Sequence, residues 1–153
     1  MPERMRRRIE ESQAYIERMS NAGPEERLAI MRERMAVRNQ QAIENLKEQL
    51  GCSDAEWQVV RPRLEAVYNL VRPLPQAGGG VASSRSELDQ RIQELYELTG
   101  DKGTDVEKIK AGLMAVRAAR ERANQKLAAA RQSLRQLMTV RQEAVLVVNG
   151  LLD

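Results

Sequence analysis

Apolar residues recur every three or four positions along most of this chain, which is the spacing that predicts amphipathic helices. The first stripe predicts an N-terminal helix within residues 1–22, ending just before Gly23. Pro24 suits the first turn of a second helix, which we expect to run to about Leu50, where Gly51 is a natural C-terminal cap. The apolar positions of these two helices are Met5, Ile9, Ile16, Met19, Leu28, Met31, Met35, Ile43, Leu46 and Leu50.

The apolar pattern continues into a third helix that opens at Ser53. Pro62 lies inside its stripe, and because the apolar spacing continues past the proline we expect a kink there rather than a break. A stretch rich in Pro and Gly ends this helix and predicts a flexible loop over residues 73–85. A short helix should follow over about residues 86–99.

The longest predicted helix begins after Thr104 and has a coiled-coil-like seam, because its apolar positions alternate steps of four and three. The seam consists of Ile109, Leu113, Val116, Arg120, Ala123, Leu127, Ala130, Leu134 and Leu137. A final helix should then reach Asn149 and Gly150. The whole pattern predicts an elongated all-α fold of about four to six helices, built on antiparallel hairpins. We expect an N-terminal helix over residues 1–22 and a hairpin domain over residues 23–153.

Three segments have a hydroxyl residue followed three positions later by Glu or Gln, which is the spacing of a capping box. They are Ser53 with Glu56, Thr104 with Glu107, and Thr139 with Gln142. In a capping box the hydroxyl accepts a hydrogen bond from a backbone N–H one turn ahead, and the Glu or Gln side chain reaches back to the N–H of the cap residue. We therefore predict that each of the three segments opens a helix.

Bulky side chains are scarce in these 153 residues, which include no Phe, one Trp and three Tyr. A compact core needs such side chains, so we expect a thin structure that buries its apolar stripes by forming a homodimer. The abundance of helix-forming residues agrees with the all-α prediction. No apolar run is long enough to span a bilayer.

The chain has no histidine, so it lacks the usual general base and the commonest metal ligand. No phosphate-binding loop is apparent either, and we expect no enzyme, no cofactor and no metal site. Met31 and Met35 lie one helical turn apart and could interest Cu(I), but methionines on an apolar face are more often core residues. Cys52 should pack at a helix start; a reactive or dimer-linking thiol is the alternative.

Basic side chains are concentrated on the longest predicted helix. From Lys108 to Arg141 the sequence has nine basic residues and one acidic residue, Glu121. The candidate client-binding residues beside the apolar seam are Lys110, Arg117, Arg120, Arg131 and Arg135. They could attract negatively charged clients; alternatively, they form a solvated face or pair with acidic residues of another helix.

Two of the capping segments resemble the paired Leu-Thr-x-x-Gln motifs of the Spy/CpxP family of periplasmic proteins, which includes the ZraP and CnrX branches. These segments are Leu50-Gly-Cys52-Ser53-Asp-Ala-Glu56 and Leu137-Met138-Thr139-Val-Arg-Gln142. The resemblance covers roughly residues 40–150 in order and spacing. It departs from the motif in detail, because Cys52 and Met138 replace its Leu, Ser53 replaces its Thr and Glu56 replaces its Gln. It implies a bent helical hairpin that dimerises into a curved molecule.

The resemblance also implies a function in binding. We expect an ATP-independent chaperone-like or stress-response protein that captures clients on a basic and apolar helical surface. A regulatory sensor or adaptor that docks on a partner protein is the alternative. A nucleic-acid-associated basic coiled coil is a second alternative, although a net charge of only +3 and few aromatic residues make nucleic acid a poor partner. We expect a periplasmic protein if a signal peptide has been removed from the chain, and a cytoplasmic one otherwise.

Overall fold

The computed structural model describes residues 3–74 and 87–153, and over these ranges the chain is helical and contains no strand. The helices are α1 (Glu3–Asn21), α2 (Pro24–Leu50), α3 (Asp54–Val71), α4 (Glu87–Gly100), α5 (Val106–Arg135) and α6 (Val140–Val148). The all-α prediction is confirmed. Pro62 lies inside α3, which continues on both sides of it. Apart from its first two residues, the loop predicted over 73–85 lies outside the described residues.

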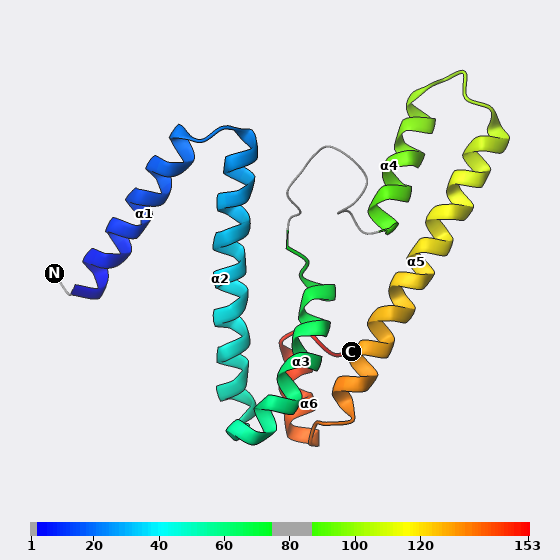
Figure 1. Cartoon of the computed structure of the whole chain (residues 1–153). Coiled ribbons are helices and arrows are strands. Elements are labelled where there is room, and N and C mark those ends of the chain that lie inside the picture. Colours follow the sequence, from blue (N-terminus) through cyan, green and yellow to red (C-terminus); the bar gives the residue numbers. More distant parts are fainter. Residues whose placement is uncertain (1–2, 75–86) are drawn as a thin grey trace.

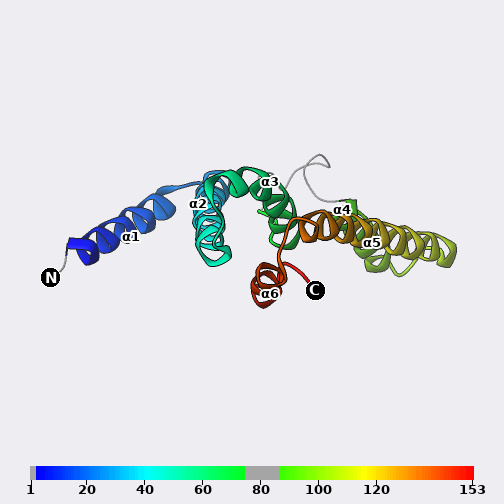
Figure 2. The ribbon, with the colours of Figure 1, turned by 90° about the horizontal axis from the view of Figure 1, so that it is seen from below.

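The molecule is elongated, with two helical arms that diverge from a common base (Figure 1). One arm consists of α1 and the first half of α2, and the other consists of α4 and most of α5. The base holds α3, α6 and the C-terminal segment. Seen from below, the arms extend to opposite sides and the molecule is thin (Figure 2). Over the described part of the chain, no helix combines the length and the apolar character that a membrane span needs.

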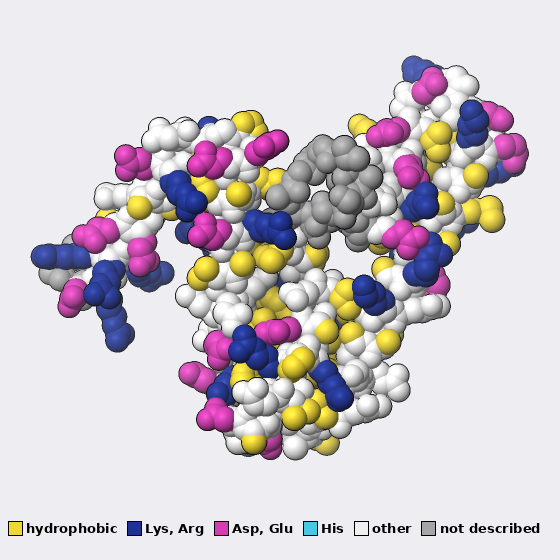
Figure 3. Space-filling view, in the orientation of Figure 1, with side chains coloured by type: hydrophobic (Ala, Val, Ile, Leu, Met, Phe, Trp, Pro, Cys, Tyr) yellow, Lys and Arg dark blue, Asp and Glu magenta, His cyan; other side chains and the backbone are white. Residues whose placement is uncertain are grey.

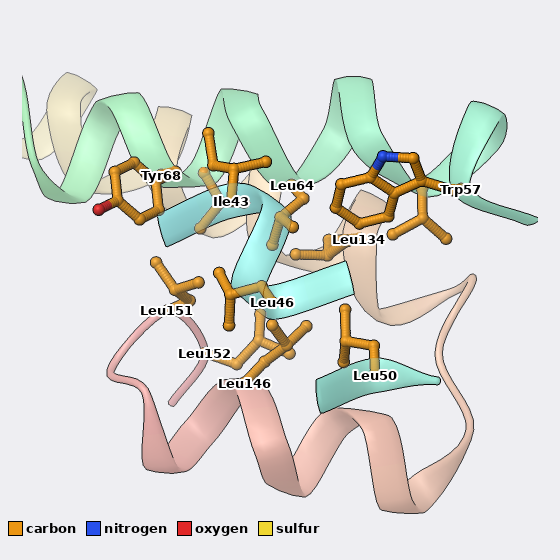
Figure 4. Close-up of a cluster of buried hydrophobic side chains, with 12 residues drawn as sticks. Ile43, Leu46, Leu50, Trp57, Leu64, Tyr68, Leu134, Leu146, Leu151 and Leu152 are labelled. Atoms are coloured by element: carbon orange, nitrogen blue, oxygen red, sulfur yellow. The ribbon is translucent and has the colours of Figure 1, made fainter. Parts of the chain in front are cut away.

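The base contains the main hydrophobic core, which we call the junction (Figure 4). It unites segments that are distant in the sequence: the end of α2, α3, the end of α5, α6 and the residues after α6. Its buried members are Ile43, Leu46, Leu50, Trp57, Val60, Leu64, Val67, Tyr68, Leu134, Leu146, Leu151 and Leu152. Burying a leucine of this kind stabilises the fold by about 1.5–3 kcal/mol. The junction is therefore the part of the chain that holds the arms together.

Two helices of the junction end in the same way, in a left-handed glycine. Gly51 has a φ of 63° and Gly150 a φ of 73°. After α6, the N–H of Gly150 donates to Val147 O at 2.9 Å and the N–H of Leu151 donates to Leu146 O at 2.9 Å. This is the Schellman pattern, in which the residue after the glycine packs back onto the last turn. It explains how the chain reverses after α6 and buries Leu151.

Both capping boxes of the junction are present. The Ser53 hydroxyl accepts from the N–H of Glu56 at 3.3 Å, and Glu56 Oε2 accepts from the N–H of Ser53 at 2.8 Å. The Thr139 hydroxyl accepts from the N–H of Gln142 at 3.3 Å, and Gln142 Oε1 accepts from the N–H of Thr139 at 3.0 Å. These pairs begin α3 and α6 and satisfy N–H groups that the helices leave unbonded.

The capping box predicted at Thr104 and Glu107 is wrong. The cap of α5 is Asp105, whose carboxylate accepts from the N–H of Glu107 at 3.3 Å. Thr104 belongs to the preceding turn, where its N–H donates to Asp101 O at 3.1 Å. The Glu107 carboxylate pairs with Lys110 instead of reaching back. The turn between α4 and α5 therefore shifts the helix start by one residue.

The single seam predicted along α5 is also wrong in its middle. Val116, Ala119 and Leu134 are buried, whereas the predicted positions Arg120 and Ala123 are exposed. The first half of α5 packs on α4 and its last turns pack on α3, so no one helix follows it throughout.

The helices of the first arm touch only over a short length. No residue of α1 is buried, and Met5, Ile9 and Ile16 are 53%, 41% and 60% exposed. Arg18 pairs with Glu33 at 3.2 Å across the two helices. On α2, Ile30 is buried while the predicted apolar position Met31 is 42% exposed. The first arm therefore contributes little core of its own.

Candidate functional site

The five predicted basic residues of α5 fall into two groups. Arg131 and Arg135 lie near the end of the helix, in the junction, and are half-buried. Lys110, Arg117 and Arg120 lie in the second arm and are exposed. The two groups have different partners.

Arg131 and Arg135 hold the C-terminal segment against the junction. Arg131 donates from Nε to Leu151 O at 2.9 Å and pairs with Asp153 at 3.1 Å. Arg135 pairs with Glu143 of α6 at 2.8 Å, and its Nη2 donates to Asp153 Oδ1 at 2.8 Å. These contacts lower the pKa of Asp153, mainly through the hydrogen bond from Arg135, then through its own backbone and the charge of Arg131.

We call this set of contacts the C-terminal lock: Arg131 and Arg135 with Glu143, the Leu151 carbonyl and Asp153. It corresponds to the alternative interpretation in which the arginines pair with acidic residues elsewhere in the fold. Charge-assisted hydrogen bonds of this kind are short and directional, so both side chains are held in place. Because their donors are engaged within the chain, a client would have to displace the C-terminal segment to reach them.

The other three basic residues share one side of α5 with two exposed apolar residues. Leu113 is 39% exposed and Met114 is 69% exposed. Steps of three and four place neighbours on the same side of a helix. We call this surface the α5 stripe: Lys110, Leu113, Met114, Arg117 and Arg120.

The α5 stripe is only weakly engaged within the chain. Lys110 pairs with Glu107 at 2.8 Å, but both side chains are exposed, and such surface pairs are worth little. Arg117 and Arg120 form no ion pair or hydrogen bond with another described residue. Arg122, on a different side of the helix, binds Glu87 of α4 through two contacts. Arg117 and Arg120 are therefore the two cations of the α5 stripe that have no ion-pair partner among the described residues.

A contact that the sequence did not reveal connects the Thr139 capping box to the end of α2. Gln142 Nε2 donates to Leu50 O at 3.1 Å and approaches Cys52 Sγ at 3.8 Å. The amide of Gln142 thus accepts from its own cap, Thr139, and donates to the end of α2. The only signal for this role is that position 142 carries an amide, which can donate, whereas position 56 carries a carboxylate, which at neutral pH only accepts.

Cys52 lies half-buried beside this contact. Burial raises the pKa of its thiol, the nearby Glu56 raises it further, and Lys47 acts in the opposite direction. A raised pKa disfavours the thiolate, which is the reactive form of cysteine. The surroundings therefore support packing rather than reactivity.

The described residues contain no group of three or more His, Cys, Asp or Glu that could hold a metal ion. They do form a small cleft of about 180 Å³ at the edge of the junction. The polar groups of its lining bind one another: Arg72 Nη2 donates to the backbone carbonyl of Asn149 at 3.3 Å, and the side-chain amide of Asn149 donates to Gln49 Oε1 at 3.2 Å. Ligand pockets are commonly about 300–1,000 Å³, so this cleft is small for a binding site.

Comparison with family models, with curated proteins and with solved structures finds no match to this chain. The resemblance to the Spy/CpxP family thus stays a prediction from the two capping segments.

Proposed function

We propose that this protein is an ATP-independent, chaperone-like or stress-response binding protein that captures clients on the α5 stripe. The observation that carries the proposal is the combination of two exposed apolar side chains, Leu113 and Met114, with two arginines that face solvent, Arg117 and Arg120. A partly unfolded protein exposes apolar residues that could pack on the two apolar side chains. It also exposes acidic residues that could pair with the two arginines.

Capture would occur in two steps. The arginines attract an acidic client over several ångströms, and the attraction weakens as salt shortens the screening length. Apolar contact with Leu113 and Met114 then holds the client. Neither step requires nucleotide. We expect capture to be strongest at low ionic strength and to weaken at about 0.5 M salt, where exposed charges are largely screened.

The resemblance to the Spy/CpxP family supports the same function and a periplasmic location. It also supports a homodimer, as do the scarcity of bulky residues and the apolar residues that both arms leave exposed.

The test is suppression of the aggregation of an acidic client, without nucleotide. Arg117→Gln with Arg120→Gln should remove at least half of the suppression, because the two unpaired cations of the α5 stripe are lost. The matched control is Arg6→Gln with Arg8→Gln, which removes the same charge from exposed positions of α1. Arg131 and Arg135 are left unchanged because their substitution would disturb the C-terminal lock.

Three results would contradict the proposal. Full suppression by the Arg117/Arg120 variant would show that the stripe is not the capture surface. Saturable binding of a single partner without any suppression would favour the adaptor. Binding of generic DNA with a steep dependence on salt would favour the nucleic-acid alternative.

A further inference from the structure

The helix α3 carries apolar residues on two opposite sides. One side packs into the junction through Trp57, Val60, Leu64 and Val67. The other side, which we call the outer α3 face, consists of Ala55, Val59, Pro62, Ala66 and Leu70, at steps of four, three, four and four. All five are exposed, with Val59 at 54% and Leu70 at 36%. Hydrophobic side chains follow α3 through the lower middle of the molecule in Figure 3.

The outer α3 face carries no charge, although 31% of the residues in this chain are charged. The charged residues of α3 that follow its first turn lie beside the face or toward the core: Arg61, Arg63 and Glu65. Surface helices normally place charged and polar residues opposite the core, whereas a helix that is apolar on both sides is normally covered on both. The outer α3 face therefore has the composition of an interface.

We infer that the outer α3 face binds the same face of a second copy of this chain, with the two α3 helices antiparallel about a two-fold axis. In a two-fold interface the same patch must complement itself. The apolar residues of the face between Ala55 and Ala66 complement themselves in this way, because the series Ala, Val, Pro, Ala and its spacing are nearly the same when read in reverse. Reversal about their midpoint places Ala55 opposite the partner's Ala66, and Val59 opposite the partner's Pro62.

The charges beside the face are complementary in the same arrangement. Glu56 and Arg63 lie on one flank of the outer α3 face, separated by two helical turns. Antiparallel pairing about the same midpoint places Glu56 opposite position 65 of the second copy. The partner's Arg63 is two residues from that position, which is about 3 Å along the helix axis. The two-fold axis repeats this contact. The opposite flank carries the uncharged side chains of Gln58 and Asn69 next to the face and, farther round the helix, Glu65, whose charge is paired with Arg61 at 2.7 Å.

Both charged residues also have a contact within their own chain that this pairing leaves in place. Glu56 uses Oε2 for its capping box, and Arg63 donates from Nη1 to Ser133 O at 3.3 Å. A carboxylate has a second oxygen and a guanidinium has five N–H donors, so each can make a further contact. The inference rests on the proposed homodimer, whose interface it locates, and leaves the α5 stripe of each copy uncovered.

Disulfide trapping tests the register. In a Cys52→Ala background, the double variant Ala55→Cys, Ala66→Cys should form a covalent dimer on mild oxidation, because each new thiol faces the other new thiol of the partner. Within one chain the two positions are about 16 Å apart along α3, too far for a disulfide. Neither single variant should cross-link well, because each thiol would then face an alanine.

A charge in the middle of the face tests the interface without cysteines. Val59→Arg places two like charges near the axis and should raise the dimer dissociation constant at least ten-fold. The matched control is Val148→Arg, because Val148 is an exposed valine on α6, 87% accessible. Mass is measured by sedimentation equilibrium against the 17.3 kDa of one chain, with circular dichroism to show that both variants are folded.

The outcomes separate the two proposals. A wild-type chain that stays monomeric at all concentrations overturns the homodimer and this interface together, and leaves the α5 stripe to its own assay. A dimer that forms without the Ala55–Ala66 cross-link, or that Val59→Arg leaves intact, overturns the interface only. Concentration-dependent polymers abolished by Val148→Arg would show that the α3 face binds α6 of the next copy, and would also overturn it.

Discussion

The junction and the second arm use similar residues in opposite ways. Leu134 and Leu146 of the junction are fully buried, whereas Leu113 of the arm is 39% exposed. Arg135 of the junction is held by Glu143 and Asp153, whereas Arg117 of the arm has no described partner. Apart from Leu146 of α6, these leucines and arginines lie on a single helix, α5, whose last turns enter the junction.

This contrast shows where the chain puts stability and where it leaves residues available for binding. The junction combines the main core with both capping boxes, both left-handed glycines and the C-terminal lock. Regions with few buried contacts are the ones that open and adapt most easily. Substitutions of the same kind should therefore have unequal effects in the two regions.

The largest difference is expected between leucines. Leu146→Ala should reduce the free energy of unfolding by about 2–5 kcal/mol, because it leaves a cavity in a fully buried site. Leu113→Ala should cost less than about 1.5 kcal/mol, because part of this side chain already contacts water. Urea denaturation of the two variants measures the difference. Equal losses in the free energy of unfolding would mean that Leu113 contributes as much to stability in the arm as Leu146 does in the junction.

The next effect concerns the amide of Gln142, which connects the Thr139 capping box to the end of α2. Gln142→Ala should reduce stability by about 1–3 kcal/mol, because it leaves the N–H of Thr139 and the Leu50 carbonyl without their partner. Gln142→Glu should also destabilise, since a carboxylate keeps the cap but opposes the carbonyl oxygen.

The control for this prediction is the reverse exchange at the other box. Glu56→Gln keeps an acceptor for the N–H of Ser53 but removes the negative charge that favours a helix start, so it should lower the urea midpoint by less than Gln142→Glu does. If Gln142→Glu were as harmless as Glu56→Gln, the contact with Leu50 would not contribute to stability.

Sequence reasoning was accurate where the signal is local. The start of α3 at Ser53 and the start of α6 at Thr139 depend on residues three positions apart, and both boxes form as expected. At Thr104 the preceding turn competes for the same residue, and the box moved to an Asp105 cap. The separation of Arg131 and Arg135 from Arg117 and Arg120 could not be predicted, because helical spacing shows which side a residue is on and not what lies against that side. The contact of Gln142 with Leu50 spans 92 residues and leaves no periodic pattern.

A smaller effect is expected at the glycine that reverses the chain after α6. Gly150→Ala should reduce the free energy of unfolding by about 1 kcal/mol, because Gly150 has a φ of 73° and this conformation is unfavourable for residues that carry a Cβ. Gly100→Ala, in the arm, is the matched control: an added Cβ meets nothing within 4 Å at either position, and only Gly150 has a positive φ. Thermal unfolding should show a lower midpoint for Gly150→Ala alone.

The smallest effect is the pH dependence of the C-terminal lock. The folded state lowers the pKa of Asp153, chiefly through the hydrogen bond from Arg135, so the folded state binds this proton less readily than the unfolded state does. The Asp153 carboxylate therefore stabilises the fold at pH values above its ordinary pKa of about 3.9. This stabilisation is lost as the pH falls through the lower pKa that the group has in the folded state. Asp153→Asn should lower the urea midpoint at pH 7 and have progressively less effect below about pH 4.

Other carboxylates also lose favourable contacts in acid, because the pKa values of Asp54, Glu56 and Glu87 are lowered too. The quantity to measure is therefore the difference between wild type and Asp153→Asn at each pH, in which these shared losses cancel. Glu87→Gln is the comparison in the arm, since Glu87 binds Arg122 there. A difference for Asp153→Asn that stays constant from pH 7 to pH 3 would mean that its charge does not hold the lock, and that Arg131 and Arg135 rely on the backbone carbonyls.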